Sequence, residues 1–199
     1  MNKVKLRLLL SMVCFCCHTL IAQETKSPKI SPSHIGFIYG YGDQSLLAVN
    51  YDYRVAFFQP QLYYTILDRS NWNLELLLQP QYNLTEFRQV DFLPDESEGF
   101  ELGLNVGVLL RKNLLKDIVS VYILGSIGPH YVSGVPKRQS TGFIFSDNFF
   151  LGLSLKISSR VYLDLRPGIR HISNAGLQER NGGVNNTILS GGIYIKLNR

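Results

Sequence analysis

Residues 101–111, ELGLNVGVLLR, alternate apolar side chains with polar or small ones. Successive side chains of an extended strand point to opposite faces, so this alternation predicts a β-strand with two unlike surfaces. One surface carries large aliphatic side chains, from Leu102, Leu104, Val106, Val108 and Leu110. The other is polar or small with one apolar exception, and carries Glu101, Gly103, Asn105, Gly107, Leu109 and Arg111. The segment therefore predicts a strand that has one face suited to apolar surroundings.

The same pattern continues along the chain from residue 34 onward, where no amphipathic helix is evident. In residues 143–158, FIFSDNFFLGLSLKIS, large apolar residues again oppose Ser, Asn, Gly and Lys. A soluble β-sandwich would bury large residues on one face and expose a polar face, whereas the second face here is largely Gly, Ser and Asn. The alternation predicts about eight strands, over residues 34–42, 45–66, 72–87, 99–111, 118–132, 141–157, 160–173 and 187–198. The long second strand is expected to break near Pro60, since proline cannot donate a hydrogen bond to a neighbouring strand.

The connections between these strands alternate in length. Three are short, within residues 69–73, 111–117 and 158–159, and three are longer and polar, within residues 88–99, 133–140 and 174–186. An even number of strands with short turns at one end and longer loops at the other is typical of outer-membrane barrels. The sequence therefore predicts an all-β fold, an eight-stranded antiparallel transmembrane β-barrel. The alternative is a soluble lipocalin-like barrel, whose interior would be apolar enough to hold a ligand.

The N-terminal segment has the features of a secretory signal peptide. Lys3, Lys5 and Arg7 precede an apolar stretch over residues 8–21, and Ala22 offers a small residue for cleavage. We expect residues 1–22 to be the signal peptide and residues 23–199 to form the barrel. The three cysteines, Cys14, Cys16 and Cys17, would leave with the signal peptide, so the mature chain would hold no disulfide, thiol nucleophile or thiolate metal site. A lipoprotein anchor on one of them is the alternative.

The basic balance of the full chain depends on that segment. Without Lys3, Lys5 and Arg7, 17 of the 20 Lys and Arg residues remain against 15 Asp and Glu residues. The charge is therefore no argument for nucleic acid as a partner. No sequence pattern implies a metal ion or a cofactor.

A candidate site lies where the seventh predicted strand ends, in RHISNAGLQERNGGVNN, residues 170–186. His171 and Ser173 continue the apolar, lipid-facing row of this strand, and residues two apart on a strand share one face. A histidine beside a serine can remove the hydroxyl proton so that the serine oxygen attacks an ester carbonyl. The glycine-rich loop that follows could stabilise the developing oxyanion or position the site, and its candidates are Asn174, Gly176 and Asn181. The alternative is an interfacial histidine followed by an ordinary turn.

The segment from His171 to Asn185, HISNAGLQERNGGVN, resembles the active-site segment of the outer-membrane lipid A 3-O-deacylases, the PagL family. The resemblance is sharp over residues 170–185 and otherwise rests on length, signal peptide and strand count. It implies that Ser173 is the nucleophile and His171 the general base, and that the catalytic site lies at the extracellular end of the seventh and eighth strands. It also implies a serine esterase that hydrolyses the 3-O-linked acyl chain of lipid A, uses no metal ion or cofactor, and meets lipopolysaccharide on the outer-leaflet side of the cell outer membrane. Whether the protein forms a homodimer is left open.

The family places a glutamate where this chain has Asn185. A carboxylate stabilises a protonated histidine, whereas an amide can only hold the orientation of the ring. Three alternatives follow from this difference. Asn185 orients His171 in a weaker enzyme, another acid replaces the glutamate, or activity is lost. Asp147 is the candidate substitute acid, because it falls opposite His171 if Ile157 faces Val161 in the preceding turn. Glu179, in the loop, is a poorer choice.

A second class of function shares every feature of the fold. A non-catalytic barrel, structural or binding through its outer loops, would carry the same strands and signal peptide, and the missing glutamate favours it. Basic residues near the rim are expected either to pair with lipid A phosphates or to be solvated loop charges. They are Arg170, Lys137, Arg138 and Arg180.

Overall fold

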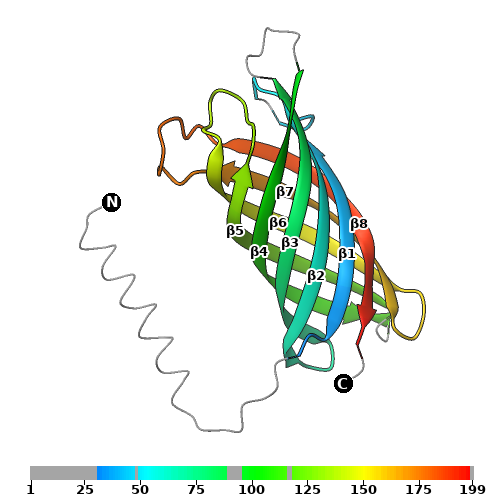
Figure 1. Ribbon diagram of the computed structural model, residues 1–199. Helices are drawn as coiled ribbons and strands as arrows, with labels where there is room; N and C mark the ends of the chain where they lie inside the picture. Colours follow the sequence, from blue (N-terminus) through cyan, green and yellow to red (C-terminus); the bar gives the residue numbers. More distant parts are fainter. Residues whose placement is uncertain (1–30, 48, 89–95, 116–117, 198–199) are drawn as a thin grey trace, which may run out of the picture. The chain divides into compact units, whose positions relative to one another are not determined.

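The computed structural model describes residues 31–47, 49–88, 96–115 and 118–197. The predicted signal peptide, residues 1–22, lies outside the described residues. The described chain is almost entirely β-strand (Figure 1). Its strands are β1 (His34–Asp43), β2 (Tyr53–Asp68), β3 (Trp72–Arg88), β4 (Glu96–Leu114), β5 (Val119–Val132), β6 (Gly142–Lys156), β7 (Val161–Ser173) and β8 (Val184–Lys196).

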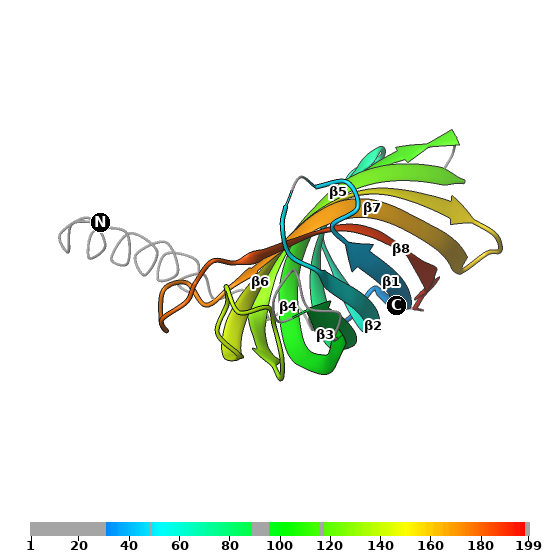
Figure 2. The ribbon, with the colours of Figure 1, turned by 90° about the horizontal axis from the view of Figure 1, so that it is seen from above.

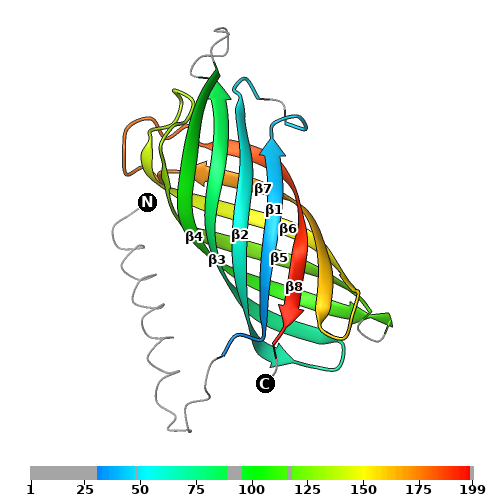
Figure 3. The same cartoon turned by 45° about the vertical axis from the view of Figure 1, so that its right-hand side comes forward.

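The eight strands form one closed antiparallel barrel in the order of the sequence. Closure comes from β1 and β8, which pair from His34 opposite Lys196 to Asp43 opposite Thr187. Figure 2 shows the strands curving around a common interior, and Figure 3 shows β1 and β8 side by side where the sheet closes. Closure leaves no unpaired sheet edge, which a chain within hydrocarbon requires. The predicted eight-stranded antiparallel transmembrane barrel is confirmed.

The alternation seen in the sequence divides the barrel into an apolar outside and a polar inside. On β4, Leu102, Leu104 and Val108 are 59%, 45% and 54% exposed, whereas Glu101 and Asn105 are fully buried in the lumen. The same division holds on β7, where Leu163, Leu165 and Ile169 face outward and Asp164, Arg166 and Arg170 face inward. This parity is the opposite of a lipocalin-like barrel, whose interior would be apolar.

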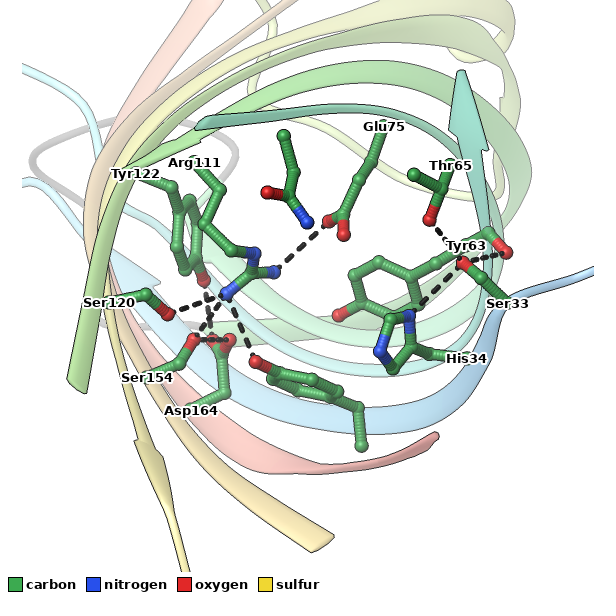
Figure 4. A network of polar contacts seen from close by, with 12 residues as sticks. Ser33, His34, Tyr63, Thr65, Glu75, Arg111, Ser120, Tyr122, Ser154 and Asp164 are labelled. Atoms are coloured by element: carbon green, nitrogen blue, oxygen red, sulfur yellow. Dashed lines mark hydrogen bonds and ion pairs between the residues drawn. The ribbon is translucent and has the colours of Figure 1, made fainter. Parts of the chain in front are cut away.

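Polar side chains from opposite walls fill the lumen. Near one end, Arg111 donates hydrogen bonds to Ser120, Ser154 and Tyr194 and pairs with Glu75 at 3.1 Å (Figure 4). Deeper in the barrel, Arg166 donates to Asp164, Gln61 and the Tyr63 hydroxyl. Because ionised groups inside a barrel are tolerated only when paired, these contacts hold the walls together as well as fill the space.

The second strand differs from the expectation in two ways. It begins at Tyr53 rather than at residue 45, so residues 44–47 and 49–52 lie outside both strands, in the connection here called the loop 44–52. It also continues through Pro60, which pairs with Phe37 of β1. The effect of the proline falls on the other neighbour: the β2–β3 pairing stops at Phe58 and resumes at Leu62 in the same register. A missing N–H donor therefore interrupts one ladder without ending the strand.

Two other strands also differ from their expected ranges. β4 extends three residues beyond each end of the expected range, and β8 begins at Val184 rather than at residue 187. The loops at residues 44–52, 133–141 and 174–183 gather at one end of the barrel, here called the loop end (Figure 1). The turns between β2 and β3 and between β6 and β7 lie at the other end. No helix in the described part of the chain is long and apolar enough to span a membrane.

Candidate active site

His171 lies on the outer face of β7 near the loop end, between two polar residues of the neighbouring strands. Its register partners are Asp147 on β6 and Asn185 on β8. The same row continues over the wall through Ile127 on β5 and Val106 on β4. Residues directly opposite one another on a sheet have Cβ atoms about 4.5–5.5 Å apart, so these side chains are immediate neighbours. The closed barrel thus aligns three polar groups on a wall that is otherwise apolar.

Asn185 forms the hydrogen bond that orients His171. The distance from His171 Nδ1 to Asn185 Oδ1 is 2.7 Å. An amide oxygen only accepts, so Nδ1 carries the proton and the Nε2 atom of the neutral ring is left as an acceptor. This is the tautomer that a general base needs.

Ser173 occupies the last position of β7 and pairs with Phe145 of β6. It shares the outward row of His171, and both side chains are partly buried. Within the described ranges no hydrogen bond joins the Ser173 hydroxyl to His171. The two residues are therefore adjacent along one face while the hydrogen bond between them is not formed.

The loop after β7 has a defined shape that its asparagines maintain. The Asn174 N–H donates to Asn181 Oδ1 at 2.9 Å, and the Gly176 N–H donates to Asn174 Oδ1 at 2.9 Å. Ala175 and Gly176 have positive φ angles of 53° and 79°, which turn the chain sharply. Asn174 and Gly176 use their amides within the loop, so in this conformation they serve positioning rather than oxyanion binding.

Asp147 lies where the expected turn places it. Ile157 N–H bonds to the Val161 carbonyl, and Asp147 pairs with His171. Among the described residues the Oδ1 atom of Asp147 is buried and has no hydrogen-bond partner. The carboxylate therefore flanks His171 on the side opposite Asn185, whereas Glu179 is exposed in the loop.

An apolar groove of about 760 Å³ lies on the outer wall, and these polar groups are part of its lining. His171, Asp147 and Asn185 form its polar part. Its apolar lining comes from strands β4 to β7 and consists of Val106, Val108, Ile127, Phe149 and Ile169. Gly125 lies among them on the outer face of β5, and a Cβ added there would meet no atom within 4 Å. The groove has open space at this point because glycine has no side chain to fill it.

Two groove features were absent from the sequence-based expectation. Leu47 and Val49, from the loop 44–52, also line the groove, although their segment reads as a strand. Gly125 interrupts the outward row of Val121, Ile123 and Ile127, and that interruption was the available signal. Residues 44–52 contain no glycine or proline, so the two strongest sequence signals of a loop are missing from them.

The basic residues have different surroundings. Arg170 is not at the rim, because it points into the lumen, is 4% exposed, and pairs with Glu101 at 2.5 Å. The guanidinium of Arg138 lies 4.5 Å from the centre of the Tyr51 ring and donates to the Gly182 carbonyl at 2.6 Å. Lys137 and Arg180 are exposed. In the part of the chain that is described, no group of three or more His, Cys, Asp or Glu residues could hold a metal ion.

Comparison with known proteins identifies a family for most of the chain. The family model described as lipid A 3-O-deacylase (PagL) matches residues 46–193. No curated protein matches the sequence significantly.

Solved structures include a similar barrel. The structure described as the outer membrane enzyme PagL is 17% identical and superposes with a TM-score of 0.59, covering 82% of this chain and 99% of its own. At that identity the likeness shows the fold. Neisserial surface protein A is 15% identical with a TM-score of 0.46, covering 82% of this chain and 95% of its own. OprG from Pseudomonas aeruginosa is 10% identical with a TM-score of 0.41, covering 85% of this chain and 98% of its own.

Proposed function

This chain belongs to the lipid A 3-O-deacylase (PagL) family, and from that membership we propose that it hydrolyses the 3-O-linked acyl ester of lipid A as a serine esterase of the outer membrane. The observation that carries the proposal is the His171–Asn185 hydrogen bond at the polar part of an apolar groove. In the neutral ring this hydrogen bond leaves Nε2 as an acceptor, on a residue that shares its strand face with Ser173.

The chemistry would proceed in two halves. His171 Nε2 takes the proton of Ser173 Oγ as Oγ bonds to the ester carbonyl carbon. The imidazolium then gives that proton to the sugar oxygen as the ester C–O bond breaks, which leaves an acyl group on Ser173. Water activated by the same Nε2 hydrolyses this acyl-serine and releases the fatty acid. The hydrogen bond between His171 and Ser173 would form as substrate binds, since catalytic hydrogen bonds often tighten only in the substrate complex.

Asn185 and Asp147 would divide the work of the family's glutamate. Asn185 holds the imidazole orientation, as Asn does in Cys-His-Asn proteases. Asp147 would supply the negative charge that an amide lacks, because it flanks the ring from β6. Asn174, Gly176 and Asn181 would fix the loop from which the oxyanion is approached.

The groove supports lipopolysaccharide as the partner and the outer leaflet as the side of the site. Its walls are apolar and face the membrane, so an acyl chain can lie along them without leaving hydrocarbon. The site lies at the loop end, and longer loops are the extracellular ones in outer-membrane barrels. Lys137 and Arg180, exposed at that end, would be free to meet lipid A phosphates.

The second candidate function is a non-catalytic barrel that binds lipid through the same groove. Two observations favour it. Asn185 stands at the position of the family's glutamate, and the bond between His171 and Ser173 is not formed within the described residues. A barrel that only holds an acyl chain would need neither the glutamate nor a hydrogen bond between His171 and Ser173.

Mass spectrometry of lipid A decides between the two. The protein would be produced in an outer membrane with normal lipid A, beside Ser173→Ala and the control Ser159→Ala in the turn at the far end of the barrel. We expect one 3-O-linked acyl chain to be lost with the wild type and with Ser159→Ala, and to be retained with Ser173→Ala. Unchanged lipid A with folded wild-type protein would support the binding barrel instead.

A further inference from the structure

The backbone of Asn185 is held by the loop 44–52 rather than by a neighbouring strand. Its N–H donates to the Tyr51 hydroxyl at 2.8 Å, and its carbonyl accepts a hydrogen bond from Gln44 Nε2 at 3.0 Å. Strand β1 pairs with β8 only as far as Thr187, two residues away. Tyr51 and Gln44 therefore supply the hydrogen bonds that β1 would have made if it had continued.

This arrangement also brings the side chains of Asn185 and His171 together. Both backbone groups of Asn185 bond to the loop, on the side away from β7. In an antiparallel ladder, paired residues whose backbone groups point away from each other form the narrow type of pair, with Cα atoms about 4.5 Å apart and side chains closest. The short His171–Asn185 hydrogen bond therefore depends on where the loop holds the Asn185 backbone.

Tyr51 and Gln44 are themselves fixed. Tyr51 is 8% exposed, and its ring lies beneath the guanidinium of Arg138. Arg138 is tied to Gly182 by a side-chain bond of 2.6 Å and a backbone bond of 2.8 Å. Gln44 is held by the Tyr53 backbone, to whose carbonyl it donates at 2.7 Å and from whose N–H it accepts at 2.9 Å. Three loops thus meet around the phenol.

We propose that Tyr51 is a positioning residue of the esterase site, which acts through Asn185 to keep His171 in the orientation and tautomer of a general base. Gln44 serves the same role on the other backbone group of Asn185. The proposal rests on the proposed esterase function for its catalytic consequence, but the positioning itself is a property of the folded protein. Tyr51 does not line the groove and so does not contact the acyl chain.

Tyr51→Phe tests the proposal because it removes the hydroxyl and keeps the ring beneath Arg138. We expect kcat to fall about 10-fold to 100-fold with KM nearly unchanged, since small displacements of catalytic groups cost rates of that order. Tyr39→Phe is the matched control, on an exposed outer-wall tyrosine whose ring contacts Phe58. If Tyr51→Phe fails to form a barrel, Gln44→Met removes the other hydrogen bond and tests the same role. An unchanged kcat in a folded variant would overturn the proposal.

Nitrogen NMR of the imidazoles in detergent micelles gives a readout that does not need activity. His171→Gln assigns the His171 signals among the barrel histidines. We expect wild type to show Nδ1 protonated and Nε2 unprotonated, and Tyr51→Phe to shift the pair toward a mixture of tautomers. A lower kcat with unchanged His171 signals would overturn positioning through Asn185. If the wild type proves inactive, the esterase proposal fails, but the same spectra still test the positioning. A change of the His171 nitrogen signals in Tyr51→Phe supports it, and unchanged signals overturn it.

Discussion

At the scale of single residues, Asn185 differs from a carboxylate in what it offers His171. Its oxygen accepts the Nδ1 hydrogen bond, so the ring is oriented, but it brings no charge to stabilise the imidazolium. An amide also has a donor end, and a rotated Asn185 would favour the tautomer with the proton on Nε2. A glutamate has no donor end and allows only the base tautomer.

Asn185→Glu is therefore expected to raise kcat by about tenfold, since a hydrogen bond to an ionised group is roughly twice as strong as one between neutral groups. Turnover of purified lipid A in mixed micelles, followed by release of the hydroxy fatty acid, measures the change. Thr187→Glu places the same carboxylate two residues along β8 and should give no increase. An equal or lower kcat for Asn185→Glu would show that the amide is already sufficient.

The same assay separates the contribution of Asp147. Asp147→Asn removes the charge beside His171 and is expected to lower kcat about tenfold, because a charge pair near a protein surface is worth on the order of 1 kcal/mol or more. The loss should shrink in the Asn185→Glu background, where a second carboxylate is present. Asp68→Asn, in the strand end far from the site, is the control. Equal losses in both backgrounds would exclude Asp147 as the substitute acid.

At the scale of elements, the groove depends on outward-facing residues that the strand register aligns across four neighbouring strands, β4 to β7. Register pairs Val108 with Gly125, Gly125 with Phe149 and Phe149 with Ile169, so a gap at the glycine lies between large side chains. Each strand alone carries only an alternating apolar row. The groove therefore follows from the pairing of the strands and from one missing side chain.

Gly125→Leu should fill this gap and weaken binding of the acyl chain. We expect KM for lipid A to rise about tenfold with kcat less affected, since the added side chain contacts the chain and not the ester, and losing burial of two methylene groups costs about 1.6 kcal/mol. Initial rates over a range of lipid A concentrations in micelles separate the two constants. Val121→Leu lies on the same face of the same strand, outside the groove lining. A KM for Gly125→Leu equal to that of Val121→Leu would show that the groove does not hold substrate.

At the scale of the whole molecule, buried ion pairs and hydrogen bonds cross the interior of the barrel, and a polar cavity of about 1100 Å³ lies at the end opposite the loop end. Buried side chains cross the lumen at several levels, from Arg111 and Glu75 through Arg166 to Arg170 and Glu101. Eight strands enclose an interior just wide enough for side chains to fill. The contacts across the lumen therefore support the wall that carries the site and narrow the interior between the two ends.

Planar-bilayer recordings are expected to show no stable conductance for the purified protein. The same preparation should migrate faster on a detergent gel before heating than after it, because a closed barrel keeps its compact form until heat breaks the ladder. Parallel recordings from a porin of known conductance confirm that insertion occurs. Steady single-channel steps from the unheated protein would contradict a lumen closed by its ion pairs.

The sequence was sufficient for the fold and for the placement of His171 and Ser173 on one face of one strand. A period of two is a local property, so residues 101–111 by themselves show which side chains face outward, and repetition of that pattern predicts a barrel. The resemblance over residues 170–185 likewise identified the segment with His171 and Ser173 from neighbouring positions. The opposition of Asp147 and His171 was predictable because a short turn fixes the register of the two strands that it joins.

Only the tertiary structure decided what surrounds that segment. Residues 45–52 were expected to belong to the second strand, and their exclusion from β2 depends on where β1 and β8 stop pairing. The groove is lined by residues of five strands and a loop, and the hydrogen bond between Tyr51 and Asn185 joins residues 134 positions apart. Local periodicity determines which face a residue occupies, whereas barrel closure and loop packing determine which distant residues share that face.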